Sequence, residues 1–416
     1  MKRKPALAFI LITVFIDVMG WGLIIPVMPD LIAGMKHISI NQASSYGSWL
    51  LFAYAFMQFI FAPILGNLSD KYVRRPILLF SMLGFGIDYL FLALTKTYGL
   101  LFVGRIIAGI TGASFTTASA YIADISTPEN RAKNFGMIGA AFGLGFIVGP
   151  ALGGLLGGLG LRAPFYAAAI LSLLNFLYGY FIVPESLDKA HRREFQWNRL
   201  IPWNSMLQLK KYPALGGLMF SLFFVYLAVY AVQGNWNYFT EYRFGWSHKL
   251  IGLSLALVGV LVAIVQAGLI RVVNPRLGNE RSVYVGLMFY SIGLFLFAFA
   301  TQSWMMFVFL IPYCLGGFAG PALQSIMSAN VPRNEQGELQ GALTGLMSLT
   351  AIIGPLIMNN LFSWFTTNKA PIYFPGVSFF LGGILILVSI FLAWRSLRHG
   401  HHLVTMIKPE EVTERA

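Results

Sequence analysis

Residues 78–94 read LLFSMLGFGIDYLFLAL, an almost wholly apolar segment that carries one acid, Asp88, near its middle. A helix that crosses a membrane needs about 20 mostly apolar residues, so this segment has the length and composition of one crossing. The whole chain shares this character, because 57% of its 416 residues are hydrophobic and only 11% are charged. In soluble domains about a quarter of the residues are charged. The sequence therefore predicts an integral membrane protein.

Apolar runs of this kind recur along the chain, separated by short polar stretches. The first run follows the basic residues MKRKP, but it continues past twenty residues and contains Asp17. We therefore interpret it as a retained helix and not as a cleaved signal peptide. The expected fold class is an all-α membrane protein with twelve transmembrane helices. They are expected at residues 6–32, 46–68, 77–95, 99–123, 135–159, 163–183, 214–240, 247–272, 283–301, 303–330, 339–366 and 374–396.

Lysine and arginine are distributed unevenly between the two sides of this topology. With the N-terminus in the cytoplasm, 22 of the 29 lie in inner segments, six lie in outer loops, and Arg105 lies within a helix. Such an excess on the inner side is the positive-inside signal, which predicts that both termini are cytoplasmic. The net charge of +13 thus reflects membrane topology and does not indicate nucleic-acid binding.

The longest inner segment divides six predicted helices from six. We expect an N-terminal six-helix bundle at 1–183, a cytoplasmic linker at 184–213, a C-terminal six-helix bundle at 214–396 and a cytoplasmic tail at 397–416. Glycine and proline recur between the halves at a spacing of 205 residues, which argues for parallel repeats. Two bundles around a central cavity are typical of transporters, although a fold alone does not establish function. The matched pairs are Gly112 with Gly317, Gly136 with Gly341, Gly149 with Gly354, and Pro150 with Pro355.

The inner loop between the second and third helices reads GNLSDKYVRRPILL, residues 66–79. An acid beside several cations can pair with helix ends in one conformation and release them in another, because a helix terminus carries about half a charge. This predicts a gating loop, and the alternative is a basic loop that only sets topology. The candidate gating residues are Gly66, Asp70, Lys71, Arg74 and Arg75.

The fifth helix contains GLGFIVGPALGGLLGG, with glycines at strict four-residue spacing from Gly145 to Gly157. These glycines line one face and allow a neighbouring helix to approach closely. Pro150 removes one backbone donor and is expected to bend the helix. Close packing alone is the alternative to a role in transport.

Three ionisable residues are predicted at membrane depth, namely Asp17, Asp88 and Arg105. Such residues are expensive in a bilayer and usually face a partner or a wet cavity. Burial raises the pKa of a carboxyl group and a nearby arginine lowers it, so a site that exchanges arginine for water or substrate could couple to protons. We expect Asp88→Asn to abolish pH-driven transport. A permanent structural ion pair between Asp88 and Arg105 is the alternative.

The second half carries polar, uncharged residues at membrane depth. Such groups could bind a polar substrate, although interhelical hydrogen bonding is the commoner role. The candidate substrate-binding residues are Gln233, Asn237, Tyr290, Gln324 and Asn359. All six histidines fall in loops or the tail, so no metal site is expected, and no cofactor motif is present. The single cysteine, Cys314, excludes an intrachain disulfide.

Two of these motifs resemble known transporter signatures. The loop at 66–79 is similar to the major facilitator signature G-x-L-A-D-R-x-G-R-K, with Val73 at a position where glycine is usual. The helix-five run resembles the antiporter signature of proton-driven drug exporters. The residues that fit it are Gly145, Gly149, Pro150, Gly153 and Gly154.

Longer segments, among them FIDVMGWGLIIPVMPDL and TEYRFGWS, look like the tetracycline-efflux group of the major facilitator superfamily. The resemblance implies export of a drug against inward proton flow, with functional charges at Asp17, Asp70, Asp88 and Arg105. The second half departs from that group, because Val262 and Tyr290 stand where the group has a histidine and an aspartate that handle protons and the metal–drug complex. Tetracycline is therefore a doubtful substrate.

The expected function is proton-coupled export of an amphipathic organic compound or drug by rocking of two halves around a central cavity. The alternative within transport is a proton-coupled importer or facilitator of an organic metabolite or metal chelate. An enzyme is not expected, because no intramembrane histidine, paired catalytic carboxylates or nucleotide loop is found. The expected partners are a small-molecule substrate, protons and the lipid bilayer, and the chain is expected to be a monomer.

Overall fold

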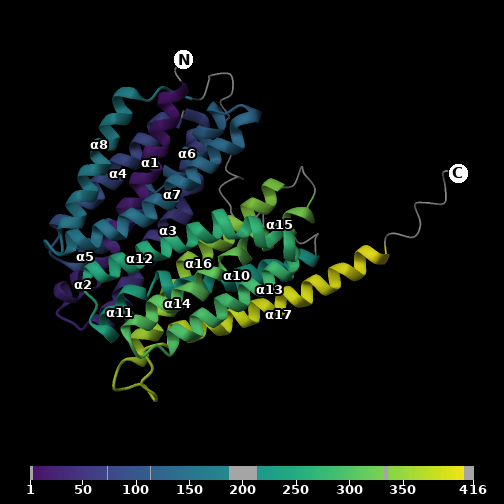
Figure 1. Ribbon diagram of the computed structural model, residues 1–416. Helices are drawn as coiled ribbons and strands as arrows, with labels where there is room; N and C mark the ends of the chain where they lie inside the picture. The colour runs from purple at the N-terminus through teal and green to yellow at the C-terminus, as the bar shows by residue number, and fades with distance from the viewer. Residues whose placement is uncertain (1–2, 73, 113, 187–212, 332–335, 407–416) are drawn as a thin grey trace. The chain divides into compact units, whose positions relative to one another are not determined.

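A computed structural model describes residues 3–72, 74–112, 114–186, 213–331 and 336–406. The described part of the chain is helical and contains no β-strand (Figure 1). Eleven of its helical stretches are long and apolar enough to cross a membrane. The all-α membrane fold predicted from the sequence is confirmed. The α-helices outside the four interrupted ones described next are α3 (Ile40–Tyr72), α4 (Arg74–Leu94), α7 (Pro128–Gly157), α8 (Ala163–Ile182), α12 (His248–Ile264), α13 (Ile270–Ala298), α16 (Gln336–Phe365) and α17 (Val377–Met406).

Four predicted helices, the first, fourth, seventh and tenth of the chain, are interrupted where continuous helices were expected. Pro26 and Pro29 interrupt the first, because proline lacks the N–H group that an inner turn of a helix requires. Glycine accompanies the other three interruptions. The resulting segments are α1 (Arg3–Ile24), η1 (Ile25–Val27) and α2 (Met28–Lys36); α5 (Tyr98–Thr111) and α6 (Ser114–Ile125); α10 (Pro213–Gln233) and α11 (Trp236–Phe244); and α14 (Ser303–Leu315), η6 (Gly316–Phe318) and α15 (Ala319–Ala329).

The stretch from His248 to Ala298 is 51 residues long and spans the predicted eighth and ninth helices. A helix of that length would measure roughly 75 Å, far more than the bilayer core of about 30 Å. Its regular course is broken by a π-helical turn, η5 (Val265–Leu269), and by Gly278, whose φ of 74° is left-handed. The length and the break favour two crossings here, and the total of twelve remains a prediction.

The repeat seen in the sequence matches features of the structure. Gly112 ends α5 at the interruption of the fourth helix, and Gly317 lies in η6 at the interruption of the tenth. Pro150 and Pro355 each lie inside a helix of 30 residues, α7 and α16. The two halves therefore repeat the same irregularities in the same order.

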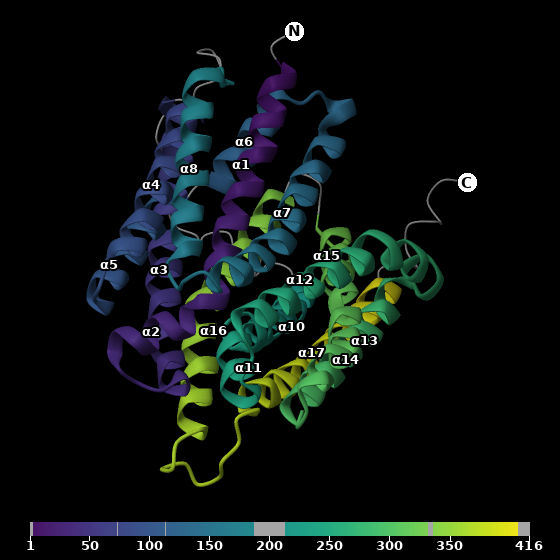
Figure 2. The same cartoon turned by 60° about the vertical axis from the view of Figure 1, so that its left-hand side comes forward.

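Contacts between residues divide the chain into two compact units. Unit 1 comprises 1–201, 234–261 and 351–375, and unit 2 comprises 202–233, 262–350 and 376–416. In unit 1, α1 packs against α7 and α8, α3 against α5, and α4 against α8. In unit 2, α17 packs against α10 and α13, and α13 also packs against α14 and α15 (Figure 2). The boundaries predicted at 183/184 and 213/214 stay predictions, since residues 187–212 lie outside the described part.

The α1–α7 interface of unit 1 is built on glycine. A Cβ atom at Gly145 would lie 2.8 Å from the carbonyl oxygen of Phe15, and one at Gly149 would lie 2.6 Å from that of Met19. At Gly153 the corresponding distance to the carbonyl oxygen of Leu23 is 2.2 Å. These contacts are with backbone, which cannot move aside as a flexible side chain can. The four-residue spacing thus lets the two helix backbones touch, as the sequence predicted.

Gly153→Ala should therefore destabilise the protein, by about 1–3 kcal/mol as is typical of overpacking. The matched control is Gly139→Ala on the same helix, where an added Cβ meets nothing within 4 Å. That change should be neutral or stabilise by about 0.5–1 kcal/mol, because alanine is the better helix former. Thermal unfolding of the purified protein, followed by tryptophan fluorescence, measures both. Equal unfolding temperatures for the two variants would contradict the packing argument.

Candidate functional site

The predicted membrane charges Asp88 and Arg105 meet in unit 1. Asp88 lies on α4 and Arg105 on α5, and Nη2 of Arg105 donates to Oδ2 of Asp88. Asp88 is 1% exposed and Arg105 is 7% exposed, so water is largely excluded from the pair. Oδ1 of Asp88 and Nε of Arg105 have no hydrogen-bond partner among the described residues. The pair is neutral overall and retains hydrogen-bonding capacity on each side.

Asp17 of α1 differs from Asp88 in its surroundings. It is partly exposed, and its carboxyl group forms a hydrogen bond with Ser114 at the start of α6. No ion pair joins it to another residue in the part of the chain that the structure describes. A carboxyl group without a cationic partner is better suited to gain and lose a proton than one that neutralises an arginine.

Tyr54 of α3 lies among the three predicted coupling residues. It interacts electrostatically with Arg105, Asp17 and Asp88, which lie on three other helices. Nε2 of Gln58, one turn along α3, donates to the Tyr54 hydroxyl at 3.1 Å and to the carbonyl oxygen of Gly112 at 2.9 Å. The second contact satisfies a carbonyl left free by the interruption of the fourth helix. Sequence reasoning missed Tyr54 and Gln58, since polar aromatic and amide residues are common in membrane helices and carry no distinctive spacing.

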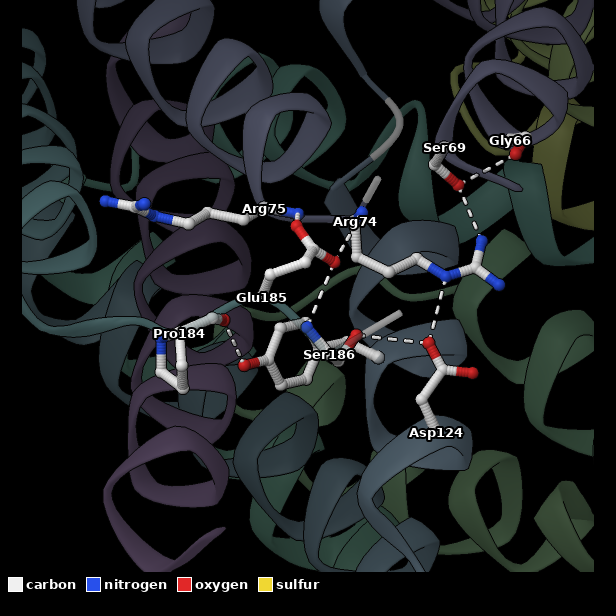
Figure 3. Close-up of polar contacts among 9 residues, drawn as sticks. Gly66, Ser69, Arg74, Arg75, Asp124, Pro184, Glu185 and Ser186 are labelled. Atoms are coloured by element: carbon white, nitrogen blue, oxygen red, sulfur yellow. Dashed lines mark hydrogen bonds and ion pairs between the residues drawn. The ribbon is translucent and has the colours of Figure 1, made fainter. Parts of the chain in front are cut away.

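The predicted gating loop takes part in a second polar network (Figure 3). Nε of Arg74 lies 3.1 Å from Oδ2 of Asp124 on α6, and its Nη1 donates to Oγ of Ser69 on α3 at 2.8 Å. Oγ of Ser69 in turn donates to the carbonyl oxygen of Gly66. One buried arginine at the start of α4 therefore connects α3, α4 and α6.

Glu185, beyond the end of α8, closes this network at the N-terminus of α4. Its Oε1 accepts from the backbone N–H of Arg74 at 2.9 Å and its Oε2 from that of Arg75 at 3.0 Å (Figure 3). A carboxylate at this place satisfies two orphan donors and faces the positive end of the helix dipole. The sequence assigned the helix-pairing acid to Asp70, whose side chain lies outside the described part, and missed Glu185 because it is more than a hundred residues away along the chain.

The remaining predicted gating residues contribute less. Lys71 is exposed. Arg75 donates through its guanidinium group to the carbonyl oxygen of Tyr180 on α8, and its guanidinium also lies 5.9 Å from the centre of the Tyr180 ring. Arg74 and Arg75 thus join the start of α4 to α6 and α8, and the gating role of the loop stays a prediction.

The antiporter-like run on α7 has a second contact face. A Cβ at Gly154 would lie 2.4 Å from the carbonyl oxygen of His248, and one at Gly252 would lie 2.2 Å from that of Pro150. His248 and Gly252 belong to the first turns of α12, which is part of unit 1. The four glycines and one proline of the motif therefore hold α1 on one side of α7 and the beginning of α12 on the other.

The five predicted substrate-binding residues do not form one group. In unit 1, Asn237 donates through Nδ2 to the carbonyl oxygen of Ile25 at 2.9 Å, and Asn359 donates to that of Gly234 at 3.0 Å. Both asparagines are buried and join helices to one another, the alternative that the sequence left open.

The other three predicted substrate residues belong to unit 2. Gln233 is exposed at the end of α10, and Nε2 of Gln324 donates to the Tyr226 hydroxyl at 3.3 Å. Tyr290 is buried and its hydroxyl donates to that of Tyr313 at 3.4 Å, with ring centres 4.9 Å apart. Gln233 and Gln324 therefore keep more hydrogen-bonding capacity for a ligand than Tyr290 does. No group of three or more metal-ligating side chains is found in the described residues.

The helical topology, the membrane charges and the two motifs agree with a comparison against known families. The model of the Major Facilitator Superfamily matches residues 10–355 and, in a second alignment, residues 218–405. The chain belongs to the major facilitator superfamily. It is 42% identical over 390 residues to the tetracycline resistance protein, class C, of Escherichia coli, covering 94% of this chain and 96% of that protein. To the class B protein of Escherichia coli it is 36% identical, covering 91% and 94% of the two chains.

A solved structure shares the fold at low sequence identity. The crystal structure of a bacterial homologue of the human lysosomal transporter Spinster superposes with a TM-score of 0.77 at 14% identity, covering 95% of this chain and 97% of that one. Together, the family match and the relatives identify this chain as an integral membrane secondary transporter of small molecules.

The buried pair makes a prediction about stability. Asp88→Asn should cost about 3–5 kcal/mol, because it leaves the Arg105 guanidinium buried without a counter-charge. The double variant Asp88→Asn/Arg105→Gln should recover part of that loss, since it removes both charges together. Thermal unfolding of the two single variants and the double variant forms a mutant cycle. Strictly additive losses would show that the two side chains do not act as a pair.

Proposed function

We propose that this transporter exports an amphipathic organic compound or drug in exchange for protons. The observation that carries the proposal is the 36–42% identity to tetracycline resistance proteins over more than nine-tenths of the chain, combined with a cluster of acids at membrane depth. The proposed setting is the bacterial cytoplasmic membrane, with both termini in the cytoplasm, twelve helices in two bundles, and a monomeric protein.

In this proposal Asp17 carries the coupled proton. It is partly exposed, it hydrogen-bonds to Ser114, and no ion pair occupies it among the described residues. Asp88 and Arg105 act together beside it as a neutral ion pair. The pair separates if either partner is drawn to substrate, water or Tyr54, and each charge then lacks its counter-charge. A single buried carboxylate elsewhere in the bilayer would be too expensive unless its proton could enter and leave.

Alternating access supplies the proposed mechanism of movement. At the predicted inner side, Arg74, Asp124 and Glu185 form bonds between helices of the first half, which hold that half together as it moves. At the predicted outer side, Asn237 and Asn359 bind backbone carbonyls of other helices in unit 1. Hydrogen bonds of this kind can form and break with little change in backbone conformation, which suits a rocking movement.

The second half of the chain points to the substrate class. Val262 and Tyr290 replace the histidine and aspartate that the tetracycline-efflux resemblance associates with protons and metal–drug complexes. Tyr290 instead pairs with Tyr313, and the polar groups with spare capacity, Gln233 and Gln324, are uncharged. We therefore propose a substrate that is amphipathic and that binds without a metal ion. The same replacements favour, as a second candidate, proton-coupled uptake of an organic metabolite.

Transport assays in inside-out membrane vesicles test direction and substrate. We expect an inward-acidic pH gradient to drive uptake of ethidium into vesicles that contain the protein, with little effect on tetracycline and Mg²⁺. The control is vesicles that contain no transporter. Uptake of the tetracycline–Mg²⁺ complex at a higher rate than ethidium would refute the metal-free substrate class. Loss of dye from the vesicles when their interior is acidified would indicate import.

Asp17→Asn should abolish transport driven by the pH gradient, because an amide cannot bind and release a proton. Exchange of internal for external substrate at equal pH should persist, since it requires movement of the protein without net proton transfer. Ser114→Ala is the matched control and removes only the hydrogen-bond partner. Retention of gradient-driven transport in Asp17→Asn would exclude this residue as the proton carrier.

A further inference from the structure

Three ionisable side chains that the sequence analysis did not list as functional meet at one end of unit 1. Asp30 lies on α2, Glu241 on α11 and His248 at the start of α12. Nε2 of His248 lies 2.6 Å from Oδ2 of Asp30, a distance at which an Nε2–H group donates a hydrogen bond. Asp30 and Glu241 are also in hydrogen-bond contact through their side chains. We refer to these three residues as the Asp30 cluster.

The two acids of the Asp30 cluster cannot both be ionised without a large penalty. Two carboxylates in hydrogen-bond contact repel one another, and neither can donate unless one of them holds a proton. The side chain of Asp30 is 41% exposed and is paired with His248, so it is the acid that can stay charged. Oε2 of Glu241 is buried and has no hydrogen-bond partner among the described residues. The proton therefore belongs on Glu241, which then donates to Asp30.

We propose that Asp30 and Glu241 together bind one proton, and that this shared proton holds the adjoining ends of α2, α11 and α12 together. It is a second proton site, separate from Asp17 and Asp88, and it acts on closure of this end of the protein. The backbone of His248 is already packed on Gly154 of α7, so the Asp30 cluster ties three helix ends to the antiporter-like run.

The electrostatic surroundings agree with a protonated Glu241. Burial, followed by the charge of Asp30 and the hydrogen bond with it, raises the pKa of Glu241 from its ordinary value of 4.5 to about 9. The groups that face Asp30 are His248 and Glu241, and those that face Glu241 are Asp30 and the phenol of Tyr238.

Two other cations on these helices, Lys36 and Arg243, act on other groups. Nζ of Lys36 on α2 lies over the rings of Tyr46 and Tyr98, at 4.8 and 5.8 Å from their centres. Arg243 on α11 acts on Tyr242. The charge balance at the Asp30 cluster is therefore set by its own three members.

The sign of the pH dependence follows from linkage. A pKa that is higher in the closed form than in the open form means that closure is most stable at low pH and weakens as the pH rises from about 4.5 to about 9. If one proton is involved, the equilibrium constant for opening rises by up to about tenfold per pH unit within that window. Above the window the constant no longer depends on pH.

A buried cysteine reports opening without any need for transport. Ser44 of α3 is fully buried at this end, where its Oγ donates to the carbonyl oxygen of Asn359 at 3.3 Å. We would introduce Ser44→Cys into a Cys314→Ser background and measure its reaction with N-ethylmaleimide in the purified full-length protein. Asn368→Cys, an exposed position in the same background, supplies the reference rate that removes the intrinsic pH dependence of the thiol.

We expect the normalised rate to rise several-fold to about tenfold per unit between pH 6 and pH 8.5 in the unmodified cluster. Glu241→Gln should make it low and independent of pH, because the amide donates to Asp30 at every pH. Asp30→Asn, a second variant, should move the pH dependence to lower pH, because it removes the opposing charge while the burial of Glu241 remains. His248→Gln should leave the pH dependence in place.

Two results would overturn the proposal. One is a normalised rate that does not change with pH while the Asp30 cluster is intact. The other is a pH dependence that persists in Glu241→Gln and disappears in His248→Gln, because histidine is the other side chain that changes charge near neutral pH. The assay involves no substrate, so either result is distinguishable from a failure of proton-coupled export.

Discussion

The low polarity of the bilayer is the constraint on which this structure depends. An ionised side chain in that environment must have a partner or a path to water. Asp88 meets the requirement by pairing with Arg105, and both are almost completely buried. Asp17 meets it differently, through Ser114 and partial exposure. Two acids of the same half thus have different surroundings, one in an ion pair with an arginine and the other in a hydrogen bond with a serine.

Glycine determines how the helices around these charges are held. On α7, glycines at four-residue spacing bring the backbone of α1 within contact distance, and the adjoining Gly154 and Pro150 do the same for the start of α12. At a backbone-to-backbone contact there are no side chains that can repack when the helices shift. Such an interface is therefore rigid while it is formed and has few intermediate arrangements. α7 is therefore well placed to connect the helix that carries Asp17 with the helix end that carries His248.

Acids at helix ends supply the reversible bonds of unit 1. Glu185 accepts from two backbone N–H groups at the start of α4, and Asp124 pairs with the arginine beside them. At the other end, Glu241 and Asp30 join α11 to α2. At the start of α4 the carboxylate satisfies main-chain donors, whereas Asp30 and Glu241 contact side chains, and in both places the contribution depends on charge. Bonds of this type respond to protons and to approach of other charges, whereas apolar packing does not.

Hydropathy and charge distribution along the chain determined the membrane-spanning helical fold, because each crossing needs a long apolar run regardless of what it packs against. Local spacing likewise determined the glycine face of α7 and the presence of acids and an arginine at membrane depth. The interruptions of four helices could be predicted only in part from the sequence. Pro26 and Pro29 indicate a break, whereas a glycine in a membrane helix indicates one only when its tertiary contacts are known.

Tertiary structure alone decided which charges meet. Glu185 caps a helix that begins 111 residues earlier. Tyr54 interacts with charged groups on three other helices. Asp30 contacts residues of α11 and α12 that lie more than two hundred residues away along the chain. For the same reason, only the folded chain showed that Asn237 and Asn359 form helix-to-helix hydrogen bonds. A local pattern specifies which groups a helix carries, while their pKa values and partners depend on neighbours that only the folded chain brings within hydrogen-bond distance.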